Sequence, residues 1–208
     1  GERAEVELVG KLRARLVRIE SASTVRVQAP CPYFGTCGGC HYQHAPYAYQ
    51  LGEKISILRE VMQRIGKFTA PEHIEFISGP DFEYRNRVQL HHADGKVGYL
   101  EMGSHRLCPV ERCPISSPRI NECIRALVKM ARDRRFPPFL KSIELFTNEQ
   151  DVQLNVKETG RPLAKWFFDW CGEQIPGYKS GAIKYGRFRV SARSFFQVNR
   201  FVIDALVE

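Results

Sequence analysis

Apolar and polar residues alternate along three short stretches at the start of the chain. Alternation with a period of two is typical of strands that bury one face. We therefore predict strands at Glu5–Val9, Leu12–Val17 and Thr24–Gln28. Three short strands are too few to close an independent barrel, so we expect them to be part of a larger β-structure.

Three later stretches place apolar residues at intervals of three and four, which is typical of helices that bury one face. The first begins near Pro46 and ends at Gly66, the second begins at Pro118, and the third runs from Pro162 to Gln174. We expect all three apolar stripes to be core. These stripes are Leu51, Ile55, Leu58, Met62 and Ile65; Ile120, Ile124, Leu127 and Ala131; and Leu163, Trp166, Phe167 and Trp170.

Strand patterns fill most of the remaining middle of the chain. A hairpin turn at Asp94–Gly95 joins the first two of these strands. The last strand leads through a turn into a helix that we expect to start near Asn199. The predicted strands are Tyr84–His92, Val97–Leu100, Ser142–Phe146, Asp151–Lys157 and Ile183–Val190.

Three cysteines are concentrated in ten residues, at Cys31, Cys37 and Cys40. Their spacing is C-x5-C-x2-C, and glycines between them let the backbone turn tightly enough to bring the sulfurs to one point. A zinc site would normally pair two short knuckles, and no second knuckle occurs. We favour an iron–sulfur cluster, with zinc and a disulfide or free thiols as alternatives.

A cluster of this kind needs a fourth ligand, which must come from a distant part of the chain. Cys108 and Cys113 are the candidates, and each is followed directly by proline. A lone cysteine before proline is a common arrangement for an iron–sulfur ligand that joins from a distance. The residues themselves leave both candidates open.

Composition narrows the class of protein. The chain has 208 residues, 43% of them hydrophobic, which is enough for a packed core. A net charge of +8 favours a polyanionic partner, with an ordinary basic surface as the alternative. Seven cysteines, an odd and clustered number, indicate a reducing cytoplasm. There is no long apolar run and no signal-peptide pattern, so we expect no membrane association.

Four basic residues are candidates for contact with a polyanion. Arg85 and Arg87 point to the same side of a predicted strand, and their guanidinium groups could fork onto phosphates. Arg125 and Lys129 share one face of a predicted helix at positions i and i+4. The alternatives are intramolecular salt bridges for the strand pair and an ordinary solvated face for the helix pair.

Four segments carry a resemblance to a known family. Cys31–His44, with its CPYFGTCGGC core, resembles the iron–sulfur motif of the RNA (uracil-5)-methyltransferases that act on 23S ribosomal RNA. Tyr84–Arg87, Arg112–Ile115 and Phe195–Asn199 resemble, in the same order, the family's YRxR strand, its fourth-ligand segment and its FxQVN box. The resemblance covers almost the whole chain, and its first motif is very specific.

The resemblance implies a 4Fe–4S cluster and a role for the box. In the family, the box places its first aromatic residue near the target base and its glutamine near S-adenosylmethionine, which here implies Phe195 and Gln197. The partner implied is RNA, with 23S rRNA favoured, and we expect a monomer. The implied cluster ligands are Cys31, Cys37, Cys40 and Cys113.

We therefore predict an α+β fold with four parts. These are residues 1–29 as later strands of an OB-like TRAM barrel, 30–70 as the iron–sulfur segment and a helix, 71–194 as a central mixed α/β-sheet domain that binds RNA, and 195–208 as the start of the methyltransferase domain. No glycine-rich first turn of a doubly wound domain occurs. We expect the S-adenosylmethionine-binding Rossmann-like domain to be missing, no catalytic residue in this chain, and the isolated chain to be inactive.

Other functions remain open at this point. One is a stand-alone iron–sulfur module that binds RNA, and another is a portion of a tRNA (uracil-5)-methyltransferase. A third is an electron-transfer or radical enzyme, although the C-x5-C-x2-C spacing does not match the C-x3-C-x2-C that is usual for radical S-adenosylmethionine enzymes.

Overall fold

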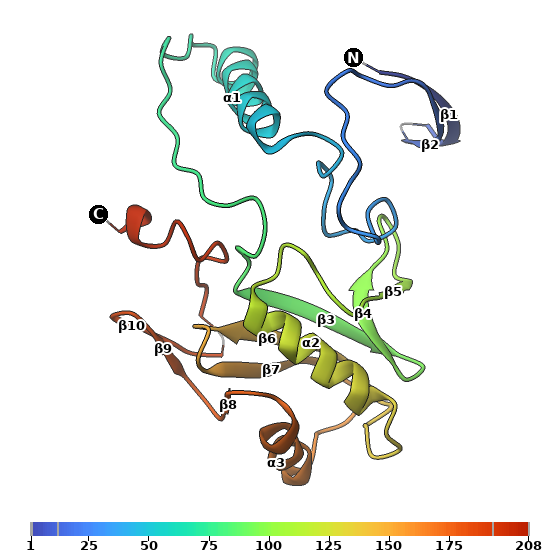
Figure 1. The fold of residues 1–208 in the computed structure, drawn as a ribbon, viewed down its shortest axis with the longest axis vertical. Coiled ribbons are helices and arrows are strands. Elements are labelled where there is room, and N and C mark those ends of the chain that lie inside the picture. The colour runs from blue at the N-terminus through green and yellow to red at the C-terminus, as the bar shows by residue number, and fades with distance from the viewer. Residues whose placement is uncertain (1, 12, 193, 208) are drawn as a thin grey trace. The chain divides into compact units, whose positions relative to one another are not determined.

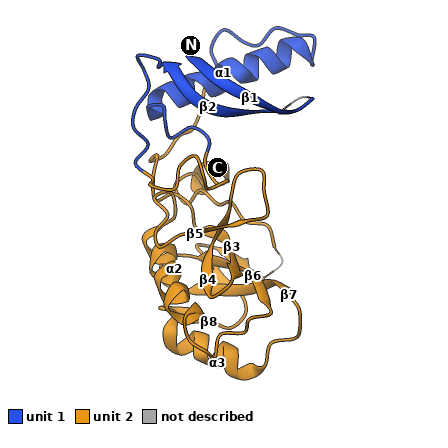
Figure 2. Cartoon of the chain, turned by 90° about the vertical axis from the view of Figure 1, so that its right-hand side faces the viewer, with its two compact units in different colours: residues 1–30, 41–74 blue, residues 31–40, 75–208 orange. Residues whose placement is uncertain are grey.

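A computed structural model describes residues 2–11, 13–192 and 194–207. It divides into two compact units (Figure 2): unit 1 comprises residues 1–30 and 41–74, and unit 2 comprises residues 31–40 and 75–208. The domain boundaries expected from the sequence stay a prediction. Within the described residues, no helix is long and apolar enough to cross a membrane.

Unit 1 contains a hairpin and one helix. Strands β1 (Arg3–Gly10) and β2 (Arg13–Ser21) pair antiparallel. The strand predicted at Thr24–Gln28 does not form, because this segment turns and its Val27 N–H bonds instead to the carbonyl of His44 at 2.9 Å. Leu12, the first residue of the second predicted strand, lies outside the described residues.

Helix α1 (Tyr47–Arg64) forms where the apolar spacing predicts it, but none of its residues is buried. Leu58, on the predicted core stripe, is exposed, and Ile65 beyond the helix end is 69% exposed. The expectation of a buried stripe is therefore wrong within unit 1. The physical reason is that the described part of this unit covers the helix face only in part, since Leu51, Ile55 and Met62 are half-buried.

Unit 2 is built on a six-stranded mixed sheet (Figure 1). Its strand order is β5-β4-β3-β6-β7-β8, in which every neighbouring pair is antiparallel except β7 and β8. The alternating sequence explains the central strands, since one side of each carries the apolar residues. The strands are β3 (Arg87–Ala93), β4 (Lys96–Leu100), β5 (Leu107–Pro109), β6 (Leu140–Thr147), β7 (Val152–Thr159) and β8 (Tyr178–Lys179).

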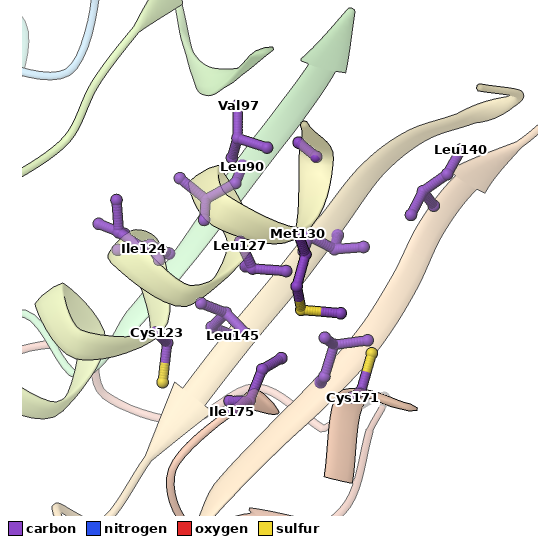
Figure 3. Packing of buried hydrophobic residues seen from close by; sticks show 14 of the residues in the cluster. Leu90, Val97, Cys123, Ile124, Leu127, Met130, Leu140, Leu145, Cys171 and Ile175 are labelled. Carbon is purple, nitrogen blue, oxygen red and sulfur yellow. The ribbon is translucent and has the colours of Figure 1, made fainter. Parts of the chain in front are cut away.

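Two helices supply the rest of the main core. Helix α2 (Pro118–Ala131) begins with proline, and the Ser117 hydroxyl caps it by accepting the Ile120 N–H at 3.4 Å. Helix α3 is Lys165–Gln174. Figure 3 shows residues of α2, such as Ile124 and Leu127, packed with residues of the sheet, such as Leu90 and Leu145. The α2 stripe is buried as predicted.

Helix α3 corrects one prediction about its aromatic residues. Phe167 and Trp170 are buried, whereas Trp166 is 48% exposed. Trp166 and Trp170 are four residues apart and so lie on the same side of the helix. Trp170 is on the part of that side that contacts the core, and Trp166 is on the part that reaches solvent. The expectation that Trp166 is core is therefore wrong.

The C-terminal end of unit 2 differs from the single strand and helix that the sequence predicts. Ile183–Val190 is a small hairpin, with β9 (Ile183–Tyr185) and β10 (Phe188–Val190) joined at Gly186, whose φ of +54° suits glycine. No helix begins near Asn199 in the described residues, and one 3₁₀ turn occurs at Asp204–Leu206.

Candidate functional site

The cysteine loop is tied to the end of strand β4. The Cys37 N–H donates to the Tyr33 carbonyl at 2.8 Å, which closes a turn inside the loop. The Gly38 N–H donates to the Leu100 carbonyl at 2.9 Å, and Cys37 forms an isolated bridge with Glu101. A Cβ at Gly38 would lie 3.2 Å from the Leu100 oxygen, so this close approach favours glycine.

The second cysteine limb follows the same strand pair. Cys108 lies on β5 opposite Tyr99 of β4 and is buried. Cys113 lies in the loop before α2, and its main chain is bound on both sides by the Asn121 side chain. The tertiary structure thus brings the loop of Cys31–Cys40 and the limb of Cys108 and Cys113 to the same end of the sheet.

The thiols of the two limbs influence one another. Burial raises the pKa of Cys31, and Cys113 adds to that increase. Burial also raises the pKa of Cys37, with contributions from Cys108 and Cys113. Burial raises the pKa of Cys108 as well, and the neighbouring Cys37 thiol opposes this in part. Four of the five candidate ligands are therefore near neighbours, although they come from segments about seventy residues apart in the sequence.

The donor chemistry fits an iron–sulfur cluster, since thiolates are the ligands that such clusters use. All five cysteines of the two limbs are free thiols. Within residues 2–11, 13–192 and 194–207, however, no three His, Cys, Asp or Glu side chains converge into a group that could hold a metal ion. The cysteine thiols are therefore the right ligands for the cluster, and four of them lie near one another. As they are arranged in this structure, however, the described side chains do not form a metal-binding group.

The remaining two cysteines lie elsewhere and are ordinary core residues. Cys123 of α2 and Cys171 of α3 are fully buried. Burial raises the pKa of each thiol to about 12, which keeps it protonated and unreactive.

The box Phe195–Asn199 presents its two phenylalanines differently. The Phe195 side chain is 86% exposed. Phe196 packs among aromatic rings, 5.0 Å from Tyr185 and 5.4 Å from Phe146 between ring centroids. Gln197 turns its amide oxygen onto the backbone, where Oε1 accepts the N–H groups of residues 198 and 199 at 2.8 and 3.2 Å. The box therefore displays one exposed aromatic ring, that of Phe195, while Gln197 is half-buried.

The four candidate RNA-binding residues lie in two different environments. Arg125 and Lys129 are exposed on α2. Arg85 and Arg87 are half-buried, and Nε of Arg85 donates to the Arg87 carbonyl at 2.9 Å. Nη1 of Arg87 donates to the Ser194 carbonyl at 2.7 Å. The helix pair faces solvent, and the strand pair is engaged within the protein.

Asn121 is a site residue that the sequence reasoning did not find. Its amide also donates to the carbonyls of Ser116 and Ser117, at 2.9 and 3.3 Å, so it ties down the whole turn after Cys113. A polar residue within the otherwise apolar stripe of Ile120 and Ile124 was the available signal.

No family model matches the chain, but curated relatives do. The chain is 32% identical to an uncharacterized RNA methyltransferase of Aquifex aeolicus, across 89% of the chain and 49% of the relative. It is 33% identical to an uncharacterized RNA methyltransferase of Halalkalibacterium halodurans, across 96% and 54%. It is also 32% identical to the 23S rRNA (uracil(1939)-C(5))-methyltransferase of Acidithiobacillus ferrooxidans, across 74% and 36%.

These homologues are RNA methyltransferases, and those whose reaction is named transfer a methyl group to C5 of uracil. The chain spans about half the length, or less, of the curated relatives that it matches. The similarity therefore connects this chain with transferases that modify RNA.

A solved structure is similar over nearly the whole chain. It is the Pyrococcus abyssi tRNA (uracil-54, C5)-methyltransferase in complex with S-adenosyl-L-homocysteine, with a TM-score of 0.60. The match covers 98% of this chain and 55% of that chain, and at 22% identity it establishes the fold alone.

This match corrects the predicted fold class. We expected a partial OB-like segment, a cysteine segment and a central sheet, with the S-adenosylmethionine-binding fold missing. That expectation is wrong, because the chain with its six-stranded mixed sheet shares the fold of a methyltransferase structure. The glycine-rich turn sought in the sequence marks one loop, whereas the match rests on the backbone path of the whole chain.

Proposed function

We propose that the chain carries out RNA recognition and holds a 4Fe–4S cluster in an S-adenosylmethionine-dependent 23S rRNA (uracil-5)-methyltransferase. The observation that carries the proposal is the box, whose Phe195 ring is 86% exposed while the neighbouring Phe196 is packed inside. The named reaction of the Acidithiobacillus relative supports the substrate. We also propose that the protein is cytoplasmic, which the free thiols support, and that it is a monomer.

An exposed aromatic ring suits the chemistry of this reaction. A uracil in folded RNA must leave its stack before C5 can react, and a ring beside the reaction site replaces part of the lost stacking, which is worth roughly 1–3 kcal/mol per base. Phe195 is free to do this, since its side chain is largely uncovered. S-adenosylmethionine supplies the methyl group when it is bound.

We propose that Gln197 contacts that cofactor through its amide nitrogen. Its Oε1 already accepts two backbone N–H groups, which fixes the direction of the side chain. The two N–H donors on Nε2 can then bind a carbonyl or carboxylate oxygen of the cofactor. In this proposal Gln197 contacts the cofactor, and Phe195, two residues earlier in the box, contacts the target base.

The cluster would be held by Cys31, Cys37, Cys40 and Cys113. The nearness of the thiols supports the assignment, because Cys113 lies close enough to Cys31 and Cys37 to help raise the pKa of each, after the larger effect of burial. Bound in this way, the cluster would join the cysteine loop to the limb before α2 and stabilise the fold by closing a long loop.

Phosphate contact is assigned chiefly to helix α2. Arg125 and Lys129 are exposed there one turn apart, so both can reach the same stretch of RNA backbone. Arg85 remains a candidate, with part of its guanidinium engaged by the Arg87 carbonyl. Such contacts position an RNA without reading its sequence.

The test uses methylation by the complete protein that carries this chain, with a 23S rRNA fragment and S-adenosylmethionine. Phe195→Ala should lower kcat at least about tenfold with cofactor affinity nearly unchanged, since stacking acts on the base. Gln197→Glu keeps the capping oxygen and removes the two amide donors, so it should chiefly weaken cofactor binding. Phe76→Ala, which removes another exposed ring, is the control.

Two results would contradict the proposal. If Phe195→Ala and Gln197→Glu retain full activity per folded molecule, neither residue contacts the base or the cofactor during the reaction. If the protein methylates transfer RNA and leaves the 23S rRNA fragment unmodified, the substrate assignment is wrong and the tRNA alternative holds.

A further inference from the structure

The two ends of the box Phe195–Asn199 are held by different means. At its C-terminal end the backbone does the work: the Asn86 N–H donates to the Val198 carbonyl, and the Arg200 N–H donates to the Tyr84 carbonyl, each at 2.9 Å. These bonds lay the end of the box along the segment that precedes β3. The position of residues 198–200 therefore follows from main-chain pairing.

At the N-terminal end, a single side chain from β3 reaches the box. Nη1 of Arg87 donates to the Ser194 carbonyl at 2.7 Å, directly before Phe195. Cζ of Arg87 lies 4.7 Å from the ring centroid of Phe146, and that ring packs against Phe196. Arg87 thus holds both the carbonyl that precedes the exposed ring and the aromatic surface on which the next ring rests.

The remaining nitrogens of this guanidinium do not face solvent. Nε and Nη2 of Arg87 are buried and have no hydrogen-bond partner among the described residues. The face of the Phe146 ring offsets part of this desolvation, because a cation is attracted to the π-face. A forked contact with an RNA phosphate needs N–H groups at the surface, so the geometry favours an internal role for Arg87 over a phosphate contact.

We propose that Arg87 is a positioning residue for the box. By fixing the Ser194 carbonyl, it sets the backbone direction from which Phe195 points outward and Phe196 inward. The inference rests on the proposed function in taking Phe195 as the ring beside the target base. The clamp itself is a property of the fold and can be measured without activity.

Hydrogen exchange of the backbone amides tests the clamp. In Arg87→Gln, the Ser194 amide, whose N–H donates to the Ser191 carbonyl at 3.2 Å, should exchange about tenfold faster, which corresponds to the loss of one charge-assisted hydrogen bond. Exchange in β3 and β6 should stay unchanged. Arg189→Gln is the matched control, because Arg189 is an exposed arginine on strand β10, in a separate sheet, and its replacement removes the same charge.

Kinetics of the complete protein give the second readout. Arg87→Gln should lower kcat for methylation severalfold while KM for S-adenosylmethionine stays within about twofold, since the ring and not the cofactor contact is displaced. Arg87→Lys should restore part of the rate, because an ammonium group can still donate to the Ser194 carbonyl.

Three outcomes would overturn the inference. The first is unchanged exchange of the Ser194 amide in Arg87→Gln. The second is exchange that rises equally across β3 and β6, which would make Arg87 an ordinary structural residue. The third concerns the slope of log K for RNA binding against log salt concentration. If Arg87→Gln reduces this slope by about one, a phosphate contact has been lost. Absence of methylation in every protein, with the exchange result intact, would overturn the proposed function and support the clamp.

Discussion

The side chain of Asn121 holds the main chain of Cys113 from both sides: Oδ1 accepts the Cys113 N–H at 2.8 Å, and Nδ2 donates to the Cys113 carbonyl at 3.0 Å. Asn121 is 5% exposed and lies in the first turn of α2, whose start is fixed by the Ser117 cap. The position of the proposed fourth cluster ligand therefore depends on helix α2.

Replacing Asn121 tests this dependence. Asn121→Ala should lower the free energy of unfolding by about 2–3 kcal/mol, because it removes the Asn121 partner of the Cys113 N–H and of the Ser116 carbonyl. Iron bound per chain should fall as well. Urea denaturation and iron analysis measure the two effects. Asn121→Asp, which keeps the Oδ1 acceptor and loses the donor, should fall between wild type and alanine, and an unchanged alanine variant would contradict the dependence.

The fourth ligand can be identified by comparing two serine variants. Cys113→Ser should lose iron and the visible absorbance of the cluster, whereas Cys108→Ser should keep both, because Cys113 is the ligand that we assign. Iron content and absorbance after anaerobic reconstitution provide the measurement. Cys108 makes this comparison informative, since its thiol already lies against Cys37. The opposite pattern would move the assignment to Cys108.

RNA binding should depend strongly on salt. Arg125→Gln and Lys129→Gln should each weaken binding by about 1 kcal/mol, since each removes one phosphate contact. Each should also reduce the slope of log K against log salt concentration by about one. Fluorescence anisotropy with labelled RNA at several salt concentrations gives both values. Lys157→Gln is the control, because Lys157 is exposed on β7 and does not belong to α2. Binding that is independent of salt would exclude the electrostatic surface.

The stability of unit 2 should depend on the ionisation of His91. Burial lowers the pKa of His91, and the nearby Glu158 opposes this in part. The folded state therefore favours the neutral imidazole, so its contribution to stability is complete above the unfolded pKa of about 6.5 and is lost as pH falls through the lower folded pKa. The urea midpoint should thus drop between pH 7.5 and pH 5.5 more in wild type than in His91→Gln. An equal drop in both would contradict this.

The spacing of apolar residues predicts well where a helix forms, but it predicts less well whether the apolar face of that helix is buried. The stripe of α2 is core because strands β3, β4 and β6 of the same unit lie against it, and Ile120, Ile124 and Leu127 are fully buried. The stripe of α1 has the same period, yet Leu58 stays exposed. Spacing shows which residues share a face, and only a covering element in the folded chain buries that face.

The sequence by itself determined the cysteine spacing of the first limb, the strand pattern of the central sheet and the box Phe195–Asn199, because these depend on neighbouring residues and on local turns. Tertiary structure decided which side chains became available. It turned Phe195 outward, engaged Arg87 with the Ser194 carbonyl and bound Asn121 to Cys113. The last two contacts join distinct segments, one of them separated by 107 residues, and such contacts are set by packing that no local pattern encodes.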